Sequence, residues 1–305
     1  MRYACAVVAL AICSGCGGAS SVTPSNAAVV DGSLSATDVR GLSSKTYEYV
    51  TSIYNDKTSI FNYPKGDRQI GSMNAPGGTG CTNVLYGYGK DKFWVVGSNE
   101  LVEYRVLKKR VRSISVSSGF LSGCAMNTKG DLAAGVLAGS DGGDVIIFKN
   151  ARGSGTVYST GLSRAGFLGY DPKGDLFADG FNADYKFTFV ELPSGSKTFR
   201  AVTVSNSVLY PGSVQWDGTY LDITDQDASV MYQYAVSGTE ATLKGSVSLS
   251  GASDCAETWI AAGVVFCADA GNNAAVVYQY PAGGSPIATL SGNIDLPLGV
   301  VAVAK

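Results

Sequence analysis

Acidic and amide side chains gather in two turns of the second half of the chain, and these are the residues best suited to bind a ligand. The turns lie in neighbouring repeats, and together with one residue of the strand before the first turn they form a cluster of Asp222, Asp225, Asp227, Asp269, Asn272 and Asn273. Carboxylate and amide oxygens are the ligands that Ca²⁺ takes in proteins, and paired hydrogen bonds from the same groups bind sugars. Tight turns also use Asp and Asn for their own backbone hydrogen bonds. Ordinary turn chemistry is therefore the favoured interpretation of the cluster, with a Ca²⁺ or sugar site as the alternative, and no other cofactor is expected.

Groups that could carry out catalysis are scarce. The sequence contains no histidine, which excludes Ser-His-Asp and Cys-His catalysis and His-ligated zinc. Glycosidase chemistry needs two carboxyl groups at a fixed separation, one of them protonated, and neither condition follows from the sequence. No catalytic residue is predicted. The enzymatic alternative is a metal-assisted hydrolase or lactonase acting on sugars, centred on Asp225, Asp227 and Asp269.

Four cysteines are expected to form two disulfides. The other three of the seven cysteines lie at or before residue 16. Cys255 and Cys267 flank a short predicted hairpin, and Cys81 and Cys124 each follow a glycine at the start of a repeat. Four thiols allow three connectivities, and these positions favour Cys255 with Cys267 and Cys81 with Cys124. Buried free thiols are the alternative. Disulfides would indicate an oxidising compartment.

The N-terminus has the features of an export signal. Arg2 supplies a positive charge, and residues 4–12 form an apolar run of nine residues, far shorter than the roughly 20 that cross a bilayer. The following Cys13-Ser14-Gly15-Cys16 resembles a bacterial lipobox, which implies a signal peptide at 1–15 and lipidation of Cys16. Cys13 stands where the lipobox usually has an aliphatic residue, so secretion without lipid is the alternative. Gly17 in place of Asp resembles the outer-membrane pattern.

Residues 16–45 are interpreted as the lipid-anchor cysteine followed by a flexible tether. The segment is rich in Ser, Ala, Gly and Thr and has no sustained period, which is typical of a linker. Its reach is about 30 Å, enough to hold a domain clear of lipid headgroups. The alternative is that part of it packs on the domain as an N-terminal strand.

A strand-like signature recurs six times after residue 46. Its last residues are 41, 44, 44, 42 and 46 positions apart. A period of 40 to 50 residues with several short strands in each repeat indicates a β-propeller, because each blade buries its faces against its neighbours. The copies are residues 60–63 (IFNY), 101–104 (LVEY), 145–148 (VIIF), 189–192 (FVEL), 231–234 (MYQY) and 277–280 (VYQY).

The two ends of the repeated region predict how the ring closes. The last segment, 297–303, has the features of the opening strand of a repeat, and the first repeat lacks that strand. Closure by the C-terminal strand would complete the first blade and leave no open edge. We therefore predict an all-β domain at 46–305, a six-bladed propeller of four-stranded antiparallel blades with almost no helix. The Asp- and Asn-rich turns would then lie on one rim around the central channel.

Two further features have simple structural explanations. Trp94, Trp216 and Trp259 are expected to pack between blades, with a sugar-stacking surface as the alternative. Lys108, Lys109, Arg110 and Arg112 form a short basic run at a predicted hairpin tip. Solvated charge is ordinary at such a tip and also blocks edge pairing, and contact with anionic headgroups is the alternative.

The repeated region resembles the NHL/YVTN-like propeller proteins of the bacterial cell envelope. The resemblance covers residues 46–305, and its clearest phrases are DPKGDLFADGF (171–181), PGSVQWDGTYLDITDQDASVMYQY (211–234) and ADAGNNAAVVYQYPAGGSPIATLSG (268–292). It implies the propeller fold. Activity does not follow from it, because one fold hosts binding scaffolds, lactonases and lyases alike.

The net charge and the export signal together limit the classes of function that are expected. Lys and Arg number 23 against 25 Asp and Glu, for a net charge of −2, so there is no basic footprint for nucleic acid. We expect a lipoprotein on the periplasmic or cell-surface side, held to a membrane by its lipid anchor. Its expected function is that of a non-enzymatic binding or scaffold module for a protein or polysaccharide partner.

Overall fold

The computed structural model describes residues 46–55, 57–82, 91–107, 110–117, 119–139 and 142–304. The predicted signal peptide at 1–15, the lipidation site Cys16 and the tether at 16–45 lie outside the described residues, as do Lys108 and Lys109. The described part contains 24 strands and one 3-10 helix, η2 (Lys149–Ala151). No described helix has the length and apolar character needed to cross a membrane.

The strands form four four-stranded sheets and one eight-stranded sheet. The first sheet, in spatial order, is β24 (Pro297–Ala304), β1 (Thr46–Ser52), β2 (Lys57–Asn62) and β3 (Gly66–Asn74). The second is β4 (Gly80–Cys81), β5 (Lys92–Val96), β6 (Glu100–Arg105) and β7 (Arg110–Ser115). The third is β8 (Leu121–Met126), β9 (Leu132–Gly139), β10 (Gly142–Phe148) and β11 (Thr156–Leu162).

The remaining strands make up the eight-stranded sheet and the last four-stranded sheet. The eight-stranded sheet begins with β12 (Arg164–Tyr170), β13 (Leu176–Phe181), β14 (Phe187–Leu192) and β15 (Arg200–Val204). It continues with β19 (Glu240–Ser248), β18 (Val230–Ser237), β17 (Leu221–Asp225) and β16 (Pro211–Trp216). The last sheet is β20 (Cys255–Ala261), β21 (Val264–Asp269), β22 (Ala274–Gln279) and β23 (Ala288–Leu290).

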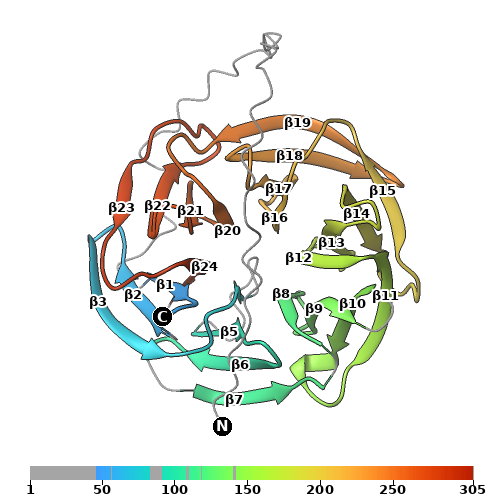
Figure 1. Ribbon diagram of the computed structural model, residues 1–305, viewed down its shortest axis with the longest axis horizontal. Helices are drawn as coiled ribbons and strands as arrows, with labels where there is room; N and C mark the ends of the chain where they lie inside the picture. Colours follow the sequence, from blue (N-terminus) through green and yellow to red (C-terminus); the bar gives the residue numbers. More distant parts are fainter. Residues whose placement is uncertain are drawn as a thin grey trace. The chain divides into compact units, whose positions relative to one another are not determined.

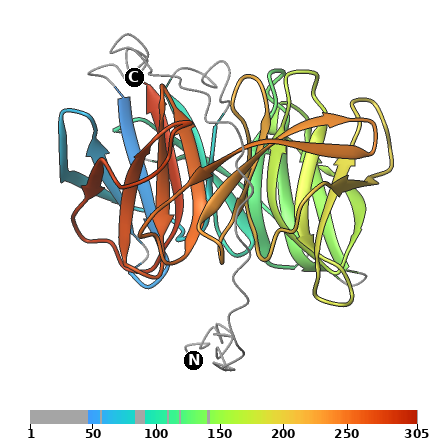
Figure 2. The ribbon, with the colours of Figure 1, turned by 90° about the horizontal axis from the view of Figure 1, so that it is seen from above.

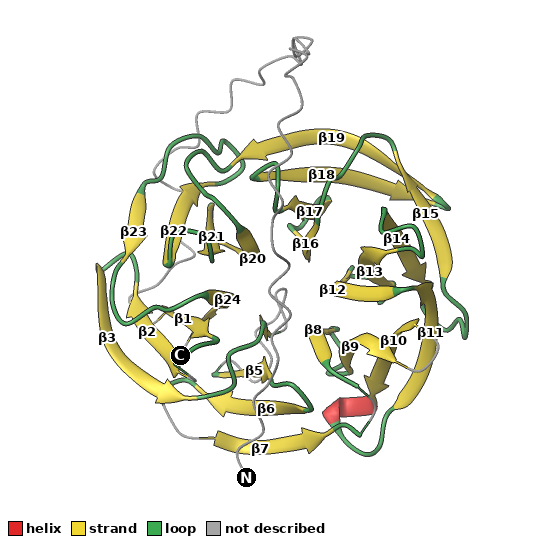
Figure 3. Cartoon of the chain, viewed as in Figure 1, coloured by secondary structure: helices red, strands yellow, loops and turns green. Residues whose placement is uncertain are grey.

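The sheets stand in a ring around a common axis, as in a propeller (Figure 1). Strands β24, β8, β12, β16 and β20 lie nearest the axis, while β3, β7, β11, β19 and β23 lie on the outside. Figure 2 shows the strands running between two opposite ends of the ring, where the turns lie. Strands dominate the cartoon and the short helix lies at the edge of the ring (Figure 3). The prediction of an all-β propeller-like fold is confirmed.

Six separate sheets are not observed, because two neighbouring four-stranded units share one sheet. Their outer strands β15 and β19 pair in parallel through Thr203 with Glu240 and Val204 with Ala241. All other pairings within the eight strands are antiparallel. An outer strand presents unpaired N–H and C=O groups, and this contact satisfies some of them. The sequence pattern contains no signal for such a contact, because it joins strands of different repeats.

The C-terminal strand completes the first sheet, as predicted. Strand β24 pairs antiparallel with β1 from Thr46 with Ala304 to Ser52 with Pro297. The first sheet is therefore built from both ends of the repeated region, with β24 as its innermost strand. Pairing the two ends of the repeated region closes the ring and covers edges that would otherwise be open.

Apolar side chains on the inner three strands of each sheet form the core between neighbouring sheets. In β21 and β5 nearly every residue is buried, whereas outer strands such as β7 alternate between exposed and half-buried residues. Trp94 and Trp259 are buried in this core, as expected from packing between blades. Burying one large apolar side chain contributes roughly 1.5–3 kcal/mol, so the ring is stabilised at every interface between sheets.

Two disulfides form between the predicted cysteine pairs. Cys81 and Cys124 join β4 to β8, strands of neighbouring sheets, with their Cα atoms 5.8 Å apart. Cys255 and Cys267 join β20 to β21 within one sheet, with a Cα separation of 5.5 Å. Both separations are usual for disulfides. Stable disulfides are a feature of oxidising compartments.

Candidate functional site

The ring has two ends with different chemistry. In the unit of β16 and β17, Pro211 pairs with Asp225 at one end and Trp216 pairs with Leu221 at the other. We call the end at which the second strands finish, at Asp225 and Asp269, the rim face. The opposite end, at which the innermost strands finish, is called the pocket face. The predicted turn residues and the main pocket lie at different ends.

On the rim face, Asp225 holds the loop that precedes β16. Its carboxylate is buried and accepts the backbone N–H groups of Leu209 at 2.7 Å, Tyr210 at 3.2 Å and Ala228 at 3.2 Å. Asp227 is an exposed member of the same turn. Carboxylates commonly hold tight turns by accepting backbone N–H bonds. Asp225 therefore fixes the position of the loop before β16 through these hydrogen bonds.

Asp269 has the equivalent role in the next sheet. Its buried carboxylate accepts backbone N–H groups from Ser253 at 3.1 Å, Asp254 at 3.2 Å and Asn272 at 3.3 Å. The Asn272 side chain also donates to it at 2.8 Å. Asn273 uses its side-chain oxygen to accept the backbone N–H of Leu296, which precedes β24, at 2.7 Å. The polar atoms of these turns are largely occupied by the chain itself.

Asp222 is separated from the other predicted residues. It pairs with Gln215 near the pocket face, and its buried carboxyl group lies 3.1 Å from the hydroxyl of Tyr280. The same hydroxyl lies 2.6 Å from Asp217 and accepts a hydrogen bond from Gln233. Burial, and then the charge of Asp217, raise the pKa of Asp222 well above its usual range. The structure therefore does not join Asp222 to Asp225 and Asp227.

Among the described residues, no group of three His, Cys, Asp or Glu side chains is arranged to hold a metal ion. Sequence reasoning missed one neighbouring carboxyl group, Asp254. Burial raises its pKa, and so do the nearby charges of Asp269 and Asp227. The side chains that make up this acidic region are thus Asp227, Asp254 and Asp269.

Exposed aromatic and apolar side chains lie beside this region on the rim face. We call Phe181, Tyr185, Leu209 and Tyr210 the aromatic patch. Tyr185 is 67% exposed, Leu209 60% and Tyr210 41%. Phe181 packs edge-on against Tyr210 at 5.1 Å and contacts Tyr185 at 6.4 Å. The guanidinium group of Arg164 lies over the Tyr185 ring at 5.3 Å.

The patch is held in place by its turns. The side-chain oxygen of Asn182 accepts the backbone N–H groups of Asp184 and Lys186, at 3.0 Å each, which fixes the turn that carries Tyr185. Asp225 fixes Leu209 and Tyr210. Sequence reasoning treated these turns as polar and overlooked the aromatic residues within them. Tyr185, placed directly after Asn-Ala-Asp in a turn, was the available signal.

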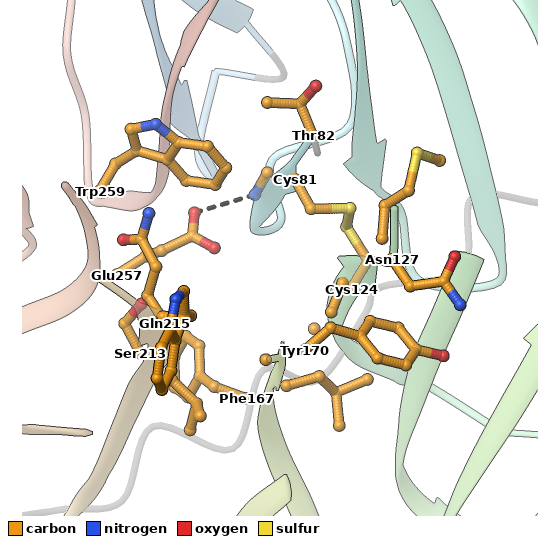
Figure 4. Close-up of a pocket in the computed structure, with 18 of the residues that line it drawn as sticks. Cys81, Thr82, Cys124, Asn127, Phe167, Tyr170, Ser213, Gln215, Glu257 and Trp259 are labelled. Atoms are coloured by element: carbon orange, nitrogen blue, oxygen red, sulfur yellow. Dashed lines mark hydrogen bonds between the residues drawn. A yellow bond between two sulfur atoms is a disulfide. The ribbon is translucent and has the colours of Figure 1, made fainter. Parts of the chain in front are cut away.

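The pocket face contains a pocket at the axis of the ring, bordered by five of the innermost strands (Figure 4). The pocket is partly open, and the space between its walls, counted together with open solvent, is about 630 Å³. Its wall carries four aromatic side chains and the Cys81–Cys124 disulfide; the aromatic residues are Phe167, Tyr170, Trp216 and Trp259. A Cβ atom on Gly169 would lie 2.5 Å from the carbonyl oxygen of Val214, so glycine there lets β12 and β16 approach closely.

Most polar side chains around the pocket are already hydrogen-bonded to the chain. The Gln215 amide donates to the carbonyl of Ile260 at 3.3 Å and accepts its N–H at 2.8 Å. Ser213 donates to the carbonyl of Thr258 at 3.0 Å. Asp171 accepts the N–H groups of Lys173 and Asp175, at 2.9 Å each, through one oxygen. These bonds hold neighbouring strands and turns together.

Glu257 is also hydrogen-bonded to the chain, but its carboxyl group points into the pocket (Figure 4). Its Oε2 atom accepts the backbone N–H groups of Gly80 at 2.9 Å and Val300 at 2.8 Å. The residue is 6% exposed, and burial raises its pKa to about 8, although the two hydrogen bonds act in the opposite direction. Sequence reasoning missed Glu257. A lone acid in the otherwise uncharged strand CAETWIA was the available signal.

Comparisons with known proteins identify the fold and no family. No family model matches the sequence, and no curated protein matches it. A protein of unknown function from Bacteroides caccae is similar in structure, with a TM-score of 0.64 and 13% identity, over 86% of this chain and 100% of that one. A chain of a nidogen/laminin complex gives a TM-score of 0.65 and 11% identity, over 85% and 98%. A functionally unknown protein from Desulfotomaculum acetoxidans gives 0.56 and 12%, over 86% and 87%.

Proposed function

We propose that the protein is an exported, lipid-anchored, six-bladed propeller that acts as a non-enzymatic binding module. Its rim face binds a partner, and the aromatic patch is the centre of that surface. The blade count treats the eight-stranded sheet as two blades that touch along their outer strands. Export is supported by the two disulfides and by the signal-like N-terminus, and Cys16 is the proposed lipidation site.

The observation that carries the proposal is the exposure of Tyr185, Leu209 and Tyr210 on turns that are fixed by hydrogen bonds. Exposed apolar groups of this kind, gathered in one place, mark interaction surfaces. Tyr and Arg are the residues that most often dominate binding energy at protein interfaces, and Arg164 lies over Tyr185. A preformed surface also binds with less loss of conformational freedom. The patch therefore favours a protein partner over a polysaccharide.

The fold is compatible with such a role. A chain with a similar fold was solved within a nidogen/laminin complex. The alternative, a metal-assisted hydrolase, gains no support from the carboxylates on which it was based. Asp225 and Asp269 are occupied by backbone N–H groups, and a metal ion would have to displace them.

Site-specific crosslinking in the native envelope would test the proposal. A photo-reactive residue is placed at Tyr185 in the full chain, and a matched control carries it at Val157, which is 57% exposed on the outer strand β11. The proposal predicts one protein adduct that forms from position 185 and not from position 157. An adduct with polysaccharide would assign the rim to the other partner class. Equal or absent adducts at both positions would contradict a rim-face binding module.

A further inference from the structure

The pocket face carries a second site that does not depend on the rim face. The pocket lies where five innermost strands end, and the side chains of β20 enter it from one side. The acidic side chains that line it are Glu257 and Asp171, and none of the lining residues is Lys or Arg. The other titratable side chain among them is Tyr170, which like Asp171 comes from the end of β12. Strands β4, β8 and β16 contribute none, apart from the disulfide.

Glu257 lacks a counter-ion in the described structure. Its Oε2 atom is bonded to two neutral N–H groups, and none of the ion pairs formed by described residues includes it. A buried carboxylate without a cation is costly. Its Oε1 atom takes part in neither backbone bond, and the carboxyl group points into the pocket (Figure 4). A positive group brought by a ligand would supply the missing partner.

The walls of the pocket suit the rest of such a ligand. Trp216, Trp259, Phe167 and Tyr170 line the space around Glu257. Aromatic faces attract cations, and organic ammonium ions are bound in this way. A small apolar group attached to the ammonium would also gain from leaving water. An anionic ligand would face two acidic side chains and no basic one.

We infer that this pocket binds a small organic ammonium ion, whose charged group contacts Oε1 of Glu257 and whose apolar part lies against the aromatic wall. Only the carboxylate form of Glu257 pairs with the cation. Because burial raises the pKa of Glu257 to about 8 in the empty pocket, binding at neutral pH releases a proton from Glu257. At pH values below that pKa, the affinity for the ammonium ion should therefore increase about tenfold for each unit by which the pH is raised. A neutral ligand that accepts a hydrogen bond from protonated Glu257 would show the opposite trend.

Calorimetric titration of the full chain with benzylamine, and with benzyl alcohol as its uncharged counterpart, would test the inference. We expect benzylamine to bind at least tenfold more tightly than benzyl alcohol at pH 8, and about tenfold more tightly at pH 7 than at pH 6. Titrations at pH 7 in two buffers of different ionisation enthalpy should show proton release. Equal affinity of the two probes, an affinity that falls as the pH rises, or absence of benzylamine binding would overturn the inference.

The variant Glu257→Gln provides the matched control. Its amide oxygen can still accept the N–H groups of Gly80 and Val300, so the strands it connects should stay in place. We expect benzylamine affinity at pH 8 to fall at least tenfold and its pH dependence to disappear, while the affinity for benzyl alcohol is unchanged. Unchanged benzylamine binding in this variant would contradict the site. If the variant does not fold, the proton-release measurement on the natural chain decides the question.

Discussion

The carboxylate of Asp225 accepts the backbone N–H of Tyr210 at 3.2 Å. Asp225 ends β17 and Tyr210 precedes β16, so this bond connects a residue of the acidic turn to a member of the aromatic patch. Asp225, which the sequence suggested as a ligand-binding residue, thus fixes the backbone that carries the Tyr210 side chain.

Replacing Asp225 should destabilise the domain. Asp225→Ala leaves three backbone N–H groups without their acceptor, and we expect the free energy of unfolding to fall by about 3 kcal/mol. Asp227→Ala is the control, because Asp227 is exposed on the same turn, and it should change the free energy of unfolding by less than about 0.5 kcal/mol. Urea unfolding followed by circular dichroism would measure both. Equal effects of the two variants would contradict the role given to Asp225.

The two disulfides should contribute unequally to stability. Cys81 and Cys124 are 43 positions apart in sequence, whereas Cys255 and Cys267 are 12 apart. A crosslink that closes a longer loop restricts the unfolded chain more, which corresponds to about 4 kcal/mol for the first disulfide and about 3 kcal/mol for the second. Paired Cys→Ser variants, compared by urea unfolding under oxidising conditions, would show the larger loss for Cys81 and Cys124. The reverse order would show that loop length does not govern their effect.

Stability should fall as the pH rises from about 5 to 8, partly because of Glu48. Its buried carboxyl group accepts the N–H of Tyr63 at 2.7 Å, and burial raises its pKa from 4.5 to about 8. A raised carboxyl pKa means that the folded state holds a proton that the unfolded state has lost in this range. The stabilisation is complete below about pH 4.5 and is lost as the pH rises through 8, by at most roughly 1.4 kcal/mol per pH unit.

The variant Glu48→Gln isolates this contribution. The amide keeps the acceptor for Tyr63 and cannot ionise, so the free energy of unfolding should depend less steeply on pH between 5 and 8 than in the natural chain. Urea unfolding at unit pH steps would measure the two slopes. Identical slopes would show that Glu48 has an ordinary pKa.

Millimolar Ca²⁺ should not stabilise the protein. The carboxylates of Asp225 and Asp269 already accept backbone N–H groups, so a bound ion would have to break bonds that hold the turns. Thermal unfolding of the full chain in Ca²⁺ and in excess chelator should give the same midpoint. A midpoint higher in Ca²⁺ by about 2 °C or more would show that the turns bind calcium.

Much of the fold follows from local sequence. The recurring signature lies in the third strand of each unit, as in β18 at Met231 to Tyr234. It could be predicted because the alternation of side chains and the turn residues that mark a strand lie within a few positions of one another in the sequence. Closure by β24 was also predictable, since an unpartnered opening strand at one end matches a missing strand at the other. The pairing of β15 with β19 was not, because it joins the outer edges of two different repeats and no spacing within one repeat specifies it.

The sites were harder to predict because their residues come from distant parts of the sequence. Glu257 meets Gly80 and Val300 across separations of 177 and 43 residues, and no spacing rule connects them. Tyr185 and Tyr210 come together through Phe181, which contacts both. The sequence placed Asp225 and Asp269 correctly beside turns, whereas Asp222 lies within β17. It could not show that backbone N–H groups occupy the carboxylates of Asp225 and Asp269.

A comparison of three affinities can show whether the aromatic patch binds a partner. The dissociation constant of the partner identified by crosslinking is measured for the natural chain, for Tyr185→Ala with Tyr210→Ala, and for Ile70→Ala with Val157→Ala. The control pair lies on outer strands and is similarly exposed, at 56% and 57%. We expect the rim variant to bind at least about tenfold more weakly and the control to bind like the natural chain. A rim variant that binds as tightly as the natural chain would show that the aromatic patch is not the binding surface.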